Sequence, residues 1–131
     1  LAVRHFIHIN IRFLAVSIFE KQASLDVKEI DVHALRSLKD NDESYQLIDV
    51  REPYEYAIAN INGELMPLNS IEDFAARIDR NKKVVVHCRS GVRSAKAIKK
   101  LEDGFGFDNL YNLTGGIRAW AKEIDEEVAL Y

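Results

Sequence analysis

The only cysteine in this sequence of 131 residues, Cys88, follows an apolar run and opens a turn of basic and small polar residues. The turn reads, in order, Arg89, Ser90, Gly91, Val92, Arg93 and Ser94. A loop that leads from a strand end into a helix points backbone N–H groups and a helix dipole at its centre. Together with the two arginines, this arrangement favours the thiolate over the thiol, and the thiolate is the nucleophile. Gly91 would allow the tight backbone curvature that such a ring requires.

A lone cysteine also has less reactive interpretations. It can fill the core, since free cysteine is among the most buried residue types, or it can cross-link to another chain. The basic and polar residues after Cys88 are unusual for a core position, so the reactive interpretation is favoured. One cysteine excludes an internal disulfide and a four-cysteine zinc site, and the histidines have no ligand spacing, so neither a metal nor a cofactor is expected.

Apolar periodicity indicates how this loop is positioned. From residue 27 onward, runs of β-branched residues alternate with stretches of helical period, which predicts an α/β fold with a mostly parallel sheet and helices on both faces. Strands are expected at 46–50, 64–68, 84–87 and 110–113, with 84–87 as the candidate central strand. Helices are expected after caps at Asp31 and Ser70, from Pro53 to Ala59, from near Arg93 to Gly104 or Gly106, and from Gly115 to Glu123. Cys88 then lies at the carboxyl end of a strand, where open parallel sheets bind ligands.

Three further polar residues stand near the predicted strand ends. Asp49 and Arg51 invite a catalytic assignment, but the favoured interpretation is that they support the loop, by pairing with each other or with nearby backbone. His87 precedes Cys88 directly. Because successive strand residues point to opposite faces, His87 is expected to pack in the sheet and not to act as the base for the thiol.

Composition is typical of one globular domain, with 47% apolar and 30% charged residues. A net charge of −3 gives no overall attraction to nucleic acid or an anionic membrane surface, and no apolar run approaches the roughly 20 residues that cross a bilayer. Residues 25–131 are expected to form the domain and residues 1–24 an extension. Alternation at 7–13 favours a strand or interdomain linker there, the apolar block at 13–19 leaves a targeting segment open, and a first residue other than Met suggests a longer parent protein.

Three ordered segments resemble the rhodanese (sulfurtransferase) superfamily, over about residues 27–123. Residues 47–53, with Glu55 and Tyr56, look like the family's first motif, residues 85–94 like its active-site loop and residues 113–120 like its closing motif. The segment 58–68 departs from the commoner family pattern. It is similar instead to rhodanese domains fused behind adenylyltransferases that activate ubiquitin-like sulfur carriers in molybdopterin or thiamine biosynthesis.

This resemblance implies a sulfurtransferase with a rhodanese-like fold. The Cys88 thiolate would take the outer sulfur of thiosulfate or of a protein persulfide, hold it as a persulfide and pass it to a nucleophilic acceptor, with a ubiquitin-like sulfur carrier as one candidate. Arg89 and Arg93 would orient an anionic donor, and Ser90 and Ser94 would contact it or cap the helix. A linked adenylyltransferase domain and a cytoplasmic location are also expected, with the periplasm as the alternative if residues 1–24 derive from a targeting segment.

Two other functions remain in view. Related cell-cycle phosphatases use Cys-x5-Arg to wrap phosphate, and arsenate reductase chemistry is similar, whereas only four residues separate Cys88 from Arg93. The shorter ring favours sulfur. A non-catalytic interaction module is the second alternative, although such members typically lack the cysteine. Lys96, Lys99 and Lys100 extend the basic surface, either as a solvated helix face or as a docking site for an acidic carrier protein.

Overall fold

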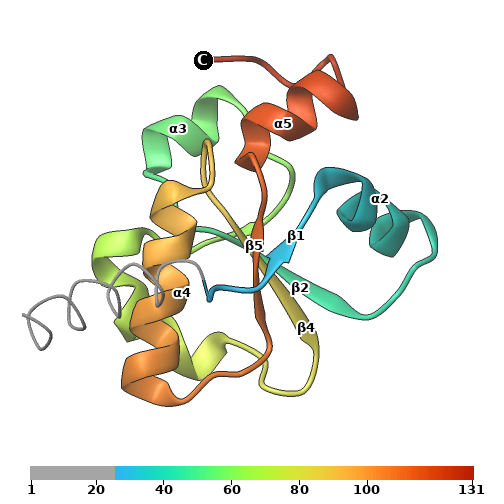
Figure 1. Cartoon of the computed structure of the whole chain (residues 1–131). Coiled ribbons are helices and arrows are strands. Elements are labelled where there is room, and N and C mark those ends of the chain that lie inside the picture. The colour runs from blue at the N-terminus through green and yellow to red at the C-terminus, as the bar shows by residue number, and fades with distance from the viewer. Residues whose placement is uncertain (1–25) are drawn as a thin grey trace, which may run out of the picture.

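Five parallel strands form the centre of the structure, a computed structural model that describes residues 26–131 (Figure 1). The strands are β1 (Glu29–Ile30), β2 (Tyr45–Asp49), β3 (Glu64–Leu65), β4 (Lys83–His87) and β5 (Leu110–Leu113). Their order across the sheet is β1-β5-β4-β2-β3, and every pairing is parallel. The predicted α/β fold is confirmed, and β4 is the central strand, as its apolar sequence indicated.

Helices cover both faces of the sheet. α2 (Val32–Asp40) and α5 (Gly116–Glu123) lie on one side, while the 3₁₀ helix η1 (Leu68–Arg77) and α4 (Val92–Phe105) lie on the other. The core is divided accordingly, because strand side chains alternate between the two faces. Val84 and Val86 of β4 pack with the α4 layer, and Val85 packs with the α2 and α5 layer.

A short helix, α3 (Pro53–Ile58), lies at the carboxyl edge of the sheet near the start of α4 (Figure 1). Pro53 occupies its first turn as predicted, and its cap residue Glu52 forms a reciprocal capping box with Glu55. α2 begins where expected, since the Asp31 carboxylate accepts a hydrogen bond from the Ala34 amide at 2.8 Å.

The segment after β3 differs from the prediction. The chain is extended only to Pro67, and Leu68 already begins η1, so the strand expected at 64–68 is shorter. Ser70 does not cap a helix but lies inside η1, where its hydroxyl donates to the Pro67 carbonyl at 3.3 Å. The spacing of Ile71 and Phe74 suits 3.0 residues per turn as well as 3.6, so periodicity could not distinguish a 3₁₀ helix from an α-helix.

The second half of the domain follows the prediction. β5 has the expected bounds, α4 ends at Gly106, which has a φ of +71°, and α5 runs to Glu123. No helix within residues 26–131 combines the length and the apolarity needed to cross a membrane. The predicted extension at 1–24 lies outside the described residues.

Candidate active site

Cys88 directly follows β4, and its side chain lies at the bottom of a loop that leads into α4. Only 1% of the residue is exposed. The Gly91 N–H points at the sulfur, with a nitrogen–Sγ distance of 3.1 Å, and the Ser94 hydroxyl oxygen lies 3.3 Å from Sγ. The sulfur is therefore buried against polar groups of its own loop, and Cys88 is at the same time a member of the core cluster on the α4 side of the sheet. Its reactivity stays a prediction.

Carbonyl oxygens of the same loop are bound from outside the ring. The Ile117 amide donates to the Cys88 carbonyl at 3.0 Å, and the Arg118 amide donates to the Arg89 carbonyl at 3.1 Å. Both amides belong to the first turn of α5, whose N–H groups have no partner within the helix. This contact holds the two loop carbonyls toward α5, while the Gly91 N–H points at the sulfur.

Two glycines make this loop geometry attainable. Gly91 has a φ of +108°, as expected of a residue that bends the ring. Gly116 has a φ of +59°, and a Cβ atom there would lie 2.5 Å from the carbonyl oxygens of both Cys88 and Arg89. Gly116 therefore permits the close approach of α5 to the loop.

Arg93 is held by Glu55 of α3 in a two-pronged ion pair. Its Nη1 and Nη2 atoms donate to Glu55 Oε1 and Oε2 at 2.6 and 2.8 Å. The Arg93 hydrogen bonds lower the pKa of Glu55 from 4.5 to about 2 against the opposing effect of burial. The same pair raises the pKa of Arg93. The charge of Arg93 next to the loop is thus balanced by a carboxylate, which the sequence analysis did not anticipate.

Arg89 projects from the loop and contacts Tyr131. Its Nη2 atom donates to the Tyr131 carbonyl, and its guanidinium lies 5.1 Å from the centre of the Tyr131 ring. Arg89 remains exposed. Of the two arginines expected to orient a donor, Arg89 is the one that pairs with no side-chain carboxylate within residues 26–131.

Asp49 and Arg51 form the predicted pair, and both are fully buried. Arg51 Nε and Nη2 donate to the Asp49 carboxylate at 2.9 and 2.7 Å, and Nη2 also reaches the Ala59 carbonyl at 2.8 Å. Arg51 Nη1 donates to the Tyr131 hydroxyl at 2.6 Å. Within the described residues the pair braces the chain after β2, including the end of α3, and reaches the Cys88 loop indirectly, through Tyr131, Glu55 and His87.

His87 packs within the sheet, as predicted. It is completely buried, its Nδ1 atom lies 3.2 Å from the Cys88 carbonyl, and its Nε2 atom lies 3.4 Å from Asp49 Oδ2. Burial lowers its pKa. His87 therefore lies with Asp49, on the side of β4 opposite to the core cluster that contains Cys88.

Ser94 and Ser90, the two loop serines, differ. Ser90 is exposed, whereas Ser94 is fully buried in the first turn of α4. The Ser94 hydroxyl contacts both Cys88 Sγ and the side-chain Oδ1 atom of Asn112 in β5. Of the two roles expected for these serines, helix capping is not observed, since α4 begins after Gly91 and has no side-chain cap.

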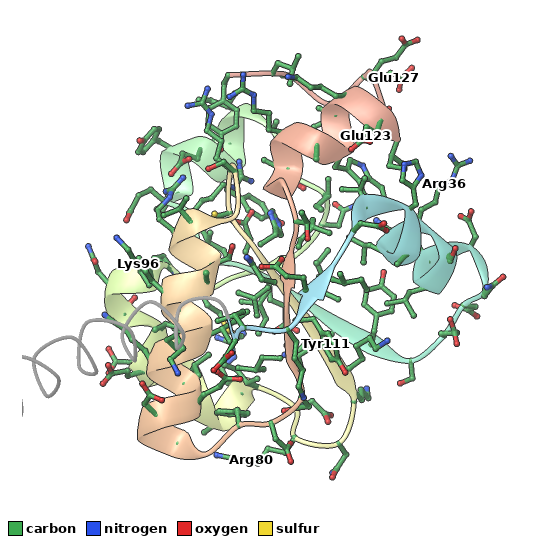
Figure 2. The ribbon with its side chains drawn as sticks, in the orientation of Figure 1. Arg36, Arg80, Lys96, Tyr111, Glu123 and Glu127 are labelled. Carbon is green, nitrogen blue, oxygen red and sulfur yellow. The ribbon has the colours of Figure 1, made fainter. Side chains whose placement is uncertain are left out.

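The lysines of α4 lie on its outer surface. Lys96 points away from the sheet (Figure 2), and Lys99 pairs with Asp103 one turn later at 3.3 Å. These features are typical of a solvated helix face. They leave docking of an acidic carrier as an untested hypothesis.

Several residues beside the loop could not be recognised as neighbours of the cysteine from the sequence. Glu55 was visible only as part of a motif, and nothing in the pattern linked Asn112, Glu29 or Tyr131 to Cys88. Glu55 and Arg51 precede Tyr131 by 76 and 80 positions in the chain, yet the Tyr131 hydroxyl donates to Glu55 and accepts from Arg51. Only the pairing of β5 with β4 in a parallel sheet could have suggested that Asn112 lies near Cys88.

Comparisons with known proteins agree with this geometry. The family model "Rhodanese-like domain" matches residues 31–123. MoeZ of Mycobacterium tuberculosis, named as a probable adenylyltransferase/sulfurtransferase, is 38% identical over 74% of this chain and 25% of its own length. The putative sulfur carrier protein YrkF of Bacillus subtilis is 35% identical over 72% of this chain and 51% of its own length.

A crystal structure of a rhodanese-like domain protein from Staphylococcus aureus superposes with a TM-score of 0.68. It is 32% identical and covers 80% of this chain and 99% of its own. The fold and the loop thus define a parallel α/β domain with a buried cysteine at the carboxyl end of its central strand. The chain belongs to the rhodanese-like domain family, and it spans a quarter to a half of the two curated relatives named above.

Proposed function

We propose that this domain is a sulfurtransferase that carries sulfur as a persulfide on Cys88. The observation that carries the proposal is the environment of Sγ. The sulfur is buried, it accepts the Gly91 N–H at 3.1 Å, and the carbonyls of Cys88 and Arg89 are bonded to α5. A buried N–H donor next to the start of a helix stabilises an anion, and the outer sulfur of a persulfide is an anion.

The reaction has two balanced steps. The Cys88 thiolate attacks the outer sulfur of thiosulfate, the sulfur–sulfur bond of the donor breaks, and its electron pair leaves with sulfite. The enzyme then holds Cys88–S–S⁻. In the second step a nucleophilic acceptor attacks the outer sulfur and the Cys88 thiolate leaves, which regenerates the starting enzyme.

The loop residues divide the remaining tasks. Arg89, exposed and charged, is proposed to attract the anionic donor, and Arg93, held by Glu55, to keep the start of α4 next to the sulfur. The Gly91 N–H points at Sγ, and the other backbone N–H groups of residues 89–94, including those of Ser90 and Val92, are proposed to bind the outer sulfur. Asp49 and Arg51 are proposed to support this region as a buried ion pair and not to touch the donor.

The acceptor is proposed to be a ubiquitin-like sulfur carrier. MoeZ is named as both an adenylyltransferase and a sulfurtransferase, and this chain aligns with a quarter of it, which supports a linked adenylyltransferase domain in the whole protein. A cytoplasmic location fits such a partner. A persulfide on another protein is an alternative donor to thiosulfate.

Intact-protein mass spectrometry tests the first step. Wild-type protein incubated with thiosulfate is expected to gain about 32 Da, the mass of one sulfur atom, and to lose it on addition of a reductant or cyanide. Cys88→Ser is the matched control, because Cys88 is the only cysteine and the variant lacks any other thiol. If thiosulfate and a protein persulfide both leave wild-type protein with a free thiol unmodified, the sulfurtransferase proposal is wrong, and phosphate-ester hydrolysis and partner binding become the functions to assay.

A further inference from the structure

The orientation of the Asn112 side-chain amide is set by its neighbours. Its Nδ2 atom donates to the Gly91 carbonyl at 3.0 Å and to Glu29 Oε1 at 3.2 Å. A carbonyl and a carboxylate accept hydrogen bonds and cannot donate them. Because both N–H groups are used, the amide cannot turn over without placing its oxygen against two other oxygens. Asn112 Oδ1 must therefore face Ser94.

Ser94 has one hydroxyl proton and two nearby oxygen or sulfur acceptors. Its oxygen lies within hydrogen-bond distance of Asn112 Oδ1, with a very short separation, and 3.3 Å from Cys88 Sγ. Asn112 Oδ1 has no proton to give, so the Ser94 proton lies between these two oxygens. Toward Sγ, Ser94 then presents a lone pair, which can accept a thiol proton but offers nothing to a thiolate.

We propose that Asn112, anchored by Glu29, is a positioning residue that directs the Ser94 hydroxyl proton away from Cys88. Ser94 then favours the states in which Sγ itself carries no charge, and it withholds a hydrogen bond from the free thiolate. The free thiol is one such state. The second is the loaded persulfide, whose charge lies on the outer sulfur, and this part of the inference rests on the proposed sulfurtransferase function.

Other charged groups around Cys88 act on the same equilibrium. Arg93 and Glu55 lie on the α4 and α3 side, Arg89 projects from the loop, and Glu29 is on the β1 side behind Asn112. His87 is separated from Sγ by the direction of β4. The test therefore has to separate loss of the Ser94 hydrogen bond from loss of the Glu29 charge.

Alkylation of the thiol by iodoacetamide, followed as a function of pH, measures the thiolate directly. Asn112→Leu, which keeps the side-chain size but accepts no hydrogen bond, frees the Ser94 proton to bind the thiolate. Its alkylation at pH 6 is expected to be about threefold to tenfold faster than in wild-type protein, with the pH midpoint displaced downward. In Asn112→Leu with Ser94→Ala this acceleration is expected to disappear.

Variants of Glu29 provide a second test of the proposal, because Glu29 is exposed and its replacement leaves the core intact. Glu29→Ala removes one anchor of the amide and is expected to accelerate alkylation by about twofold. Glu29→Gln removes the charge but keeps an acceptor for Asn112, so it measures the effect of charge alone and is expected to accelerate alkylation less than Glu29→Ala.

Unchanged or slower alkylation in folded Asn112→Leu, or acceleration that survives Ser94→Ala, would overturn the proposal. So would equal effects of the two Glu29 variants. Alkylation requires no sulfur transfer, so this result stands even if the proposed function is wrong. In equilibrium with thiosulfate and sulfite, the sulfur-loaded fraction of Asn112→Leu should in addition fall, since the free thiolate is stabilised.

Discussion

At the residue scale, one of the two arginines of the cysteine loop is paired with a carboxylate. Arg93, which the sequence suggested as a free positive charge, shares its guanidinium with the Glu55 carboxylate. A guanidinium held in this fork has a defined direction and loses little further conformational freedom on binding. We infer that Arg93 contributes position and Arg89 contributes attraction for an anionic donor.

The Glu55–Arg93 pair predicts a dependence of stability on pH. The pKa of Glu55 is lowered from 4.5 to about 2, so its contribution is present above pH 4.5 and is lost as the pH falls toward 2. Glu55→Gln is expected to unfold at a temperature lower by about 5 °C or more at pH 7, with the difference from wild-type protein shrinking between pH 4.5 and 2.

Thermal unfolding followed by circular dichroism checks this expectation. Glu126→Gln, at an exposed position, serves as the control and should unfold together with wild-type protein at each pH. A constant difference between Glu55→Gln and wild-type protein from pH 7 to pH 2 would contradict the assigned role of the Glu55 carboxylate.

At the element scale, the site is an assembly of β4, its loop and the first turn of α5. The amides of Ile117 and Arg118 bind the carbonyls of Cys88 and Arg89, so α5 shapes the ring without contributing a side chain to it. This contact requires the backbone of α5 to touch the loop. Gly116 thus has a function in the site that its place at the start of a helix did not reveal.

Replacing Gly116 tests this contact. In Gly116→Ala the new Cβ atom would lie 2.5 Å from two carbonyl oxygens, at a residue whose φ is +59°. We expect the free energy of unfolding to fall by about 2 kcal/mol or more, and alkylation of Cys88 to change with it. Gly104→Ala is the control: no atom lies within 4 Å of its added Cβ, and alanine in helix α4 should be neutral or stabilise by about 0.5 kcal/mol. Urea unfolding measures both, and equal effects would argue against the contact.

At the scale of the whole molecule, Tyr131 ties the far end of the described chain to the region after β2. Its hydroxyl accepts from Arg51 and donates to Glu55 at 2.6 and 2.8 Å, and its carbonyl accepts from Arg89. One residue thereby connects the buried Asp49–Arg51 pair, the Glu55–Arg93 pair and the cysteine loop. Burial raises the pKa of the Tyr131 hydroxyl, so it stays protonated as this donor role requires.

Tyr131→Phe leaves a buried Arg51 nitrogen without that acceptor. We expect a loss of about 1 to 3 kcal/mol in the free energy of unfolding, because hydrogen bonds to charged groups contribute that much. Tyr54→Phe, at a position that is 67% exposed, should change the free energy by less than about 0.5 kcal/mol. Denaturant unfolding of both variants decides the matter, and a similar small change in both would show that Tyr131 contributes no more than a surface tyrosine.

The sequence by itself determined the succession of helices and of strands β2 to β5, the central place of β4 and the position of Cys88 in a loop before α4. The two-residue strand β1 was not predicted. These are local properties, since alternation of apolar residues, caps and glycines act within a few positions of the chain. The same locality explains the error after β3, where the spacing of Ile71 and Phe74 suits two kinds of helix.

Only the tertiary structure decided which partners surround the thiol. Glu55, Asn112 and Tyr131 come from α3, β5 and the segment after α5, and nothing in their local sequence relates them to Cys88. Whether Arg93 is a free charge, and whether Ser94 gives a proton or a lone pair to sulfur, depends on those distant neighbours. Hydrogen bonds and charges act through space over a few ångströms, so their pairing is settled only when the sheet brings these elements together.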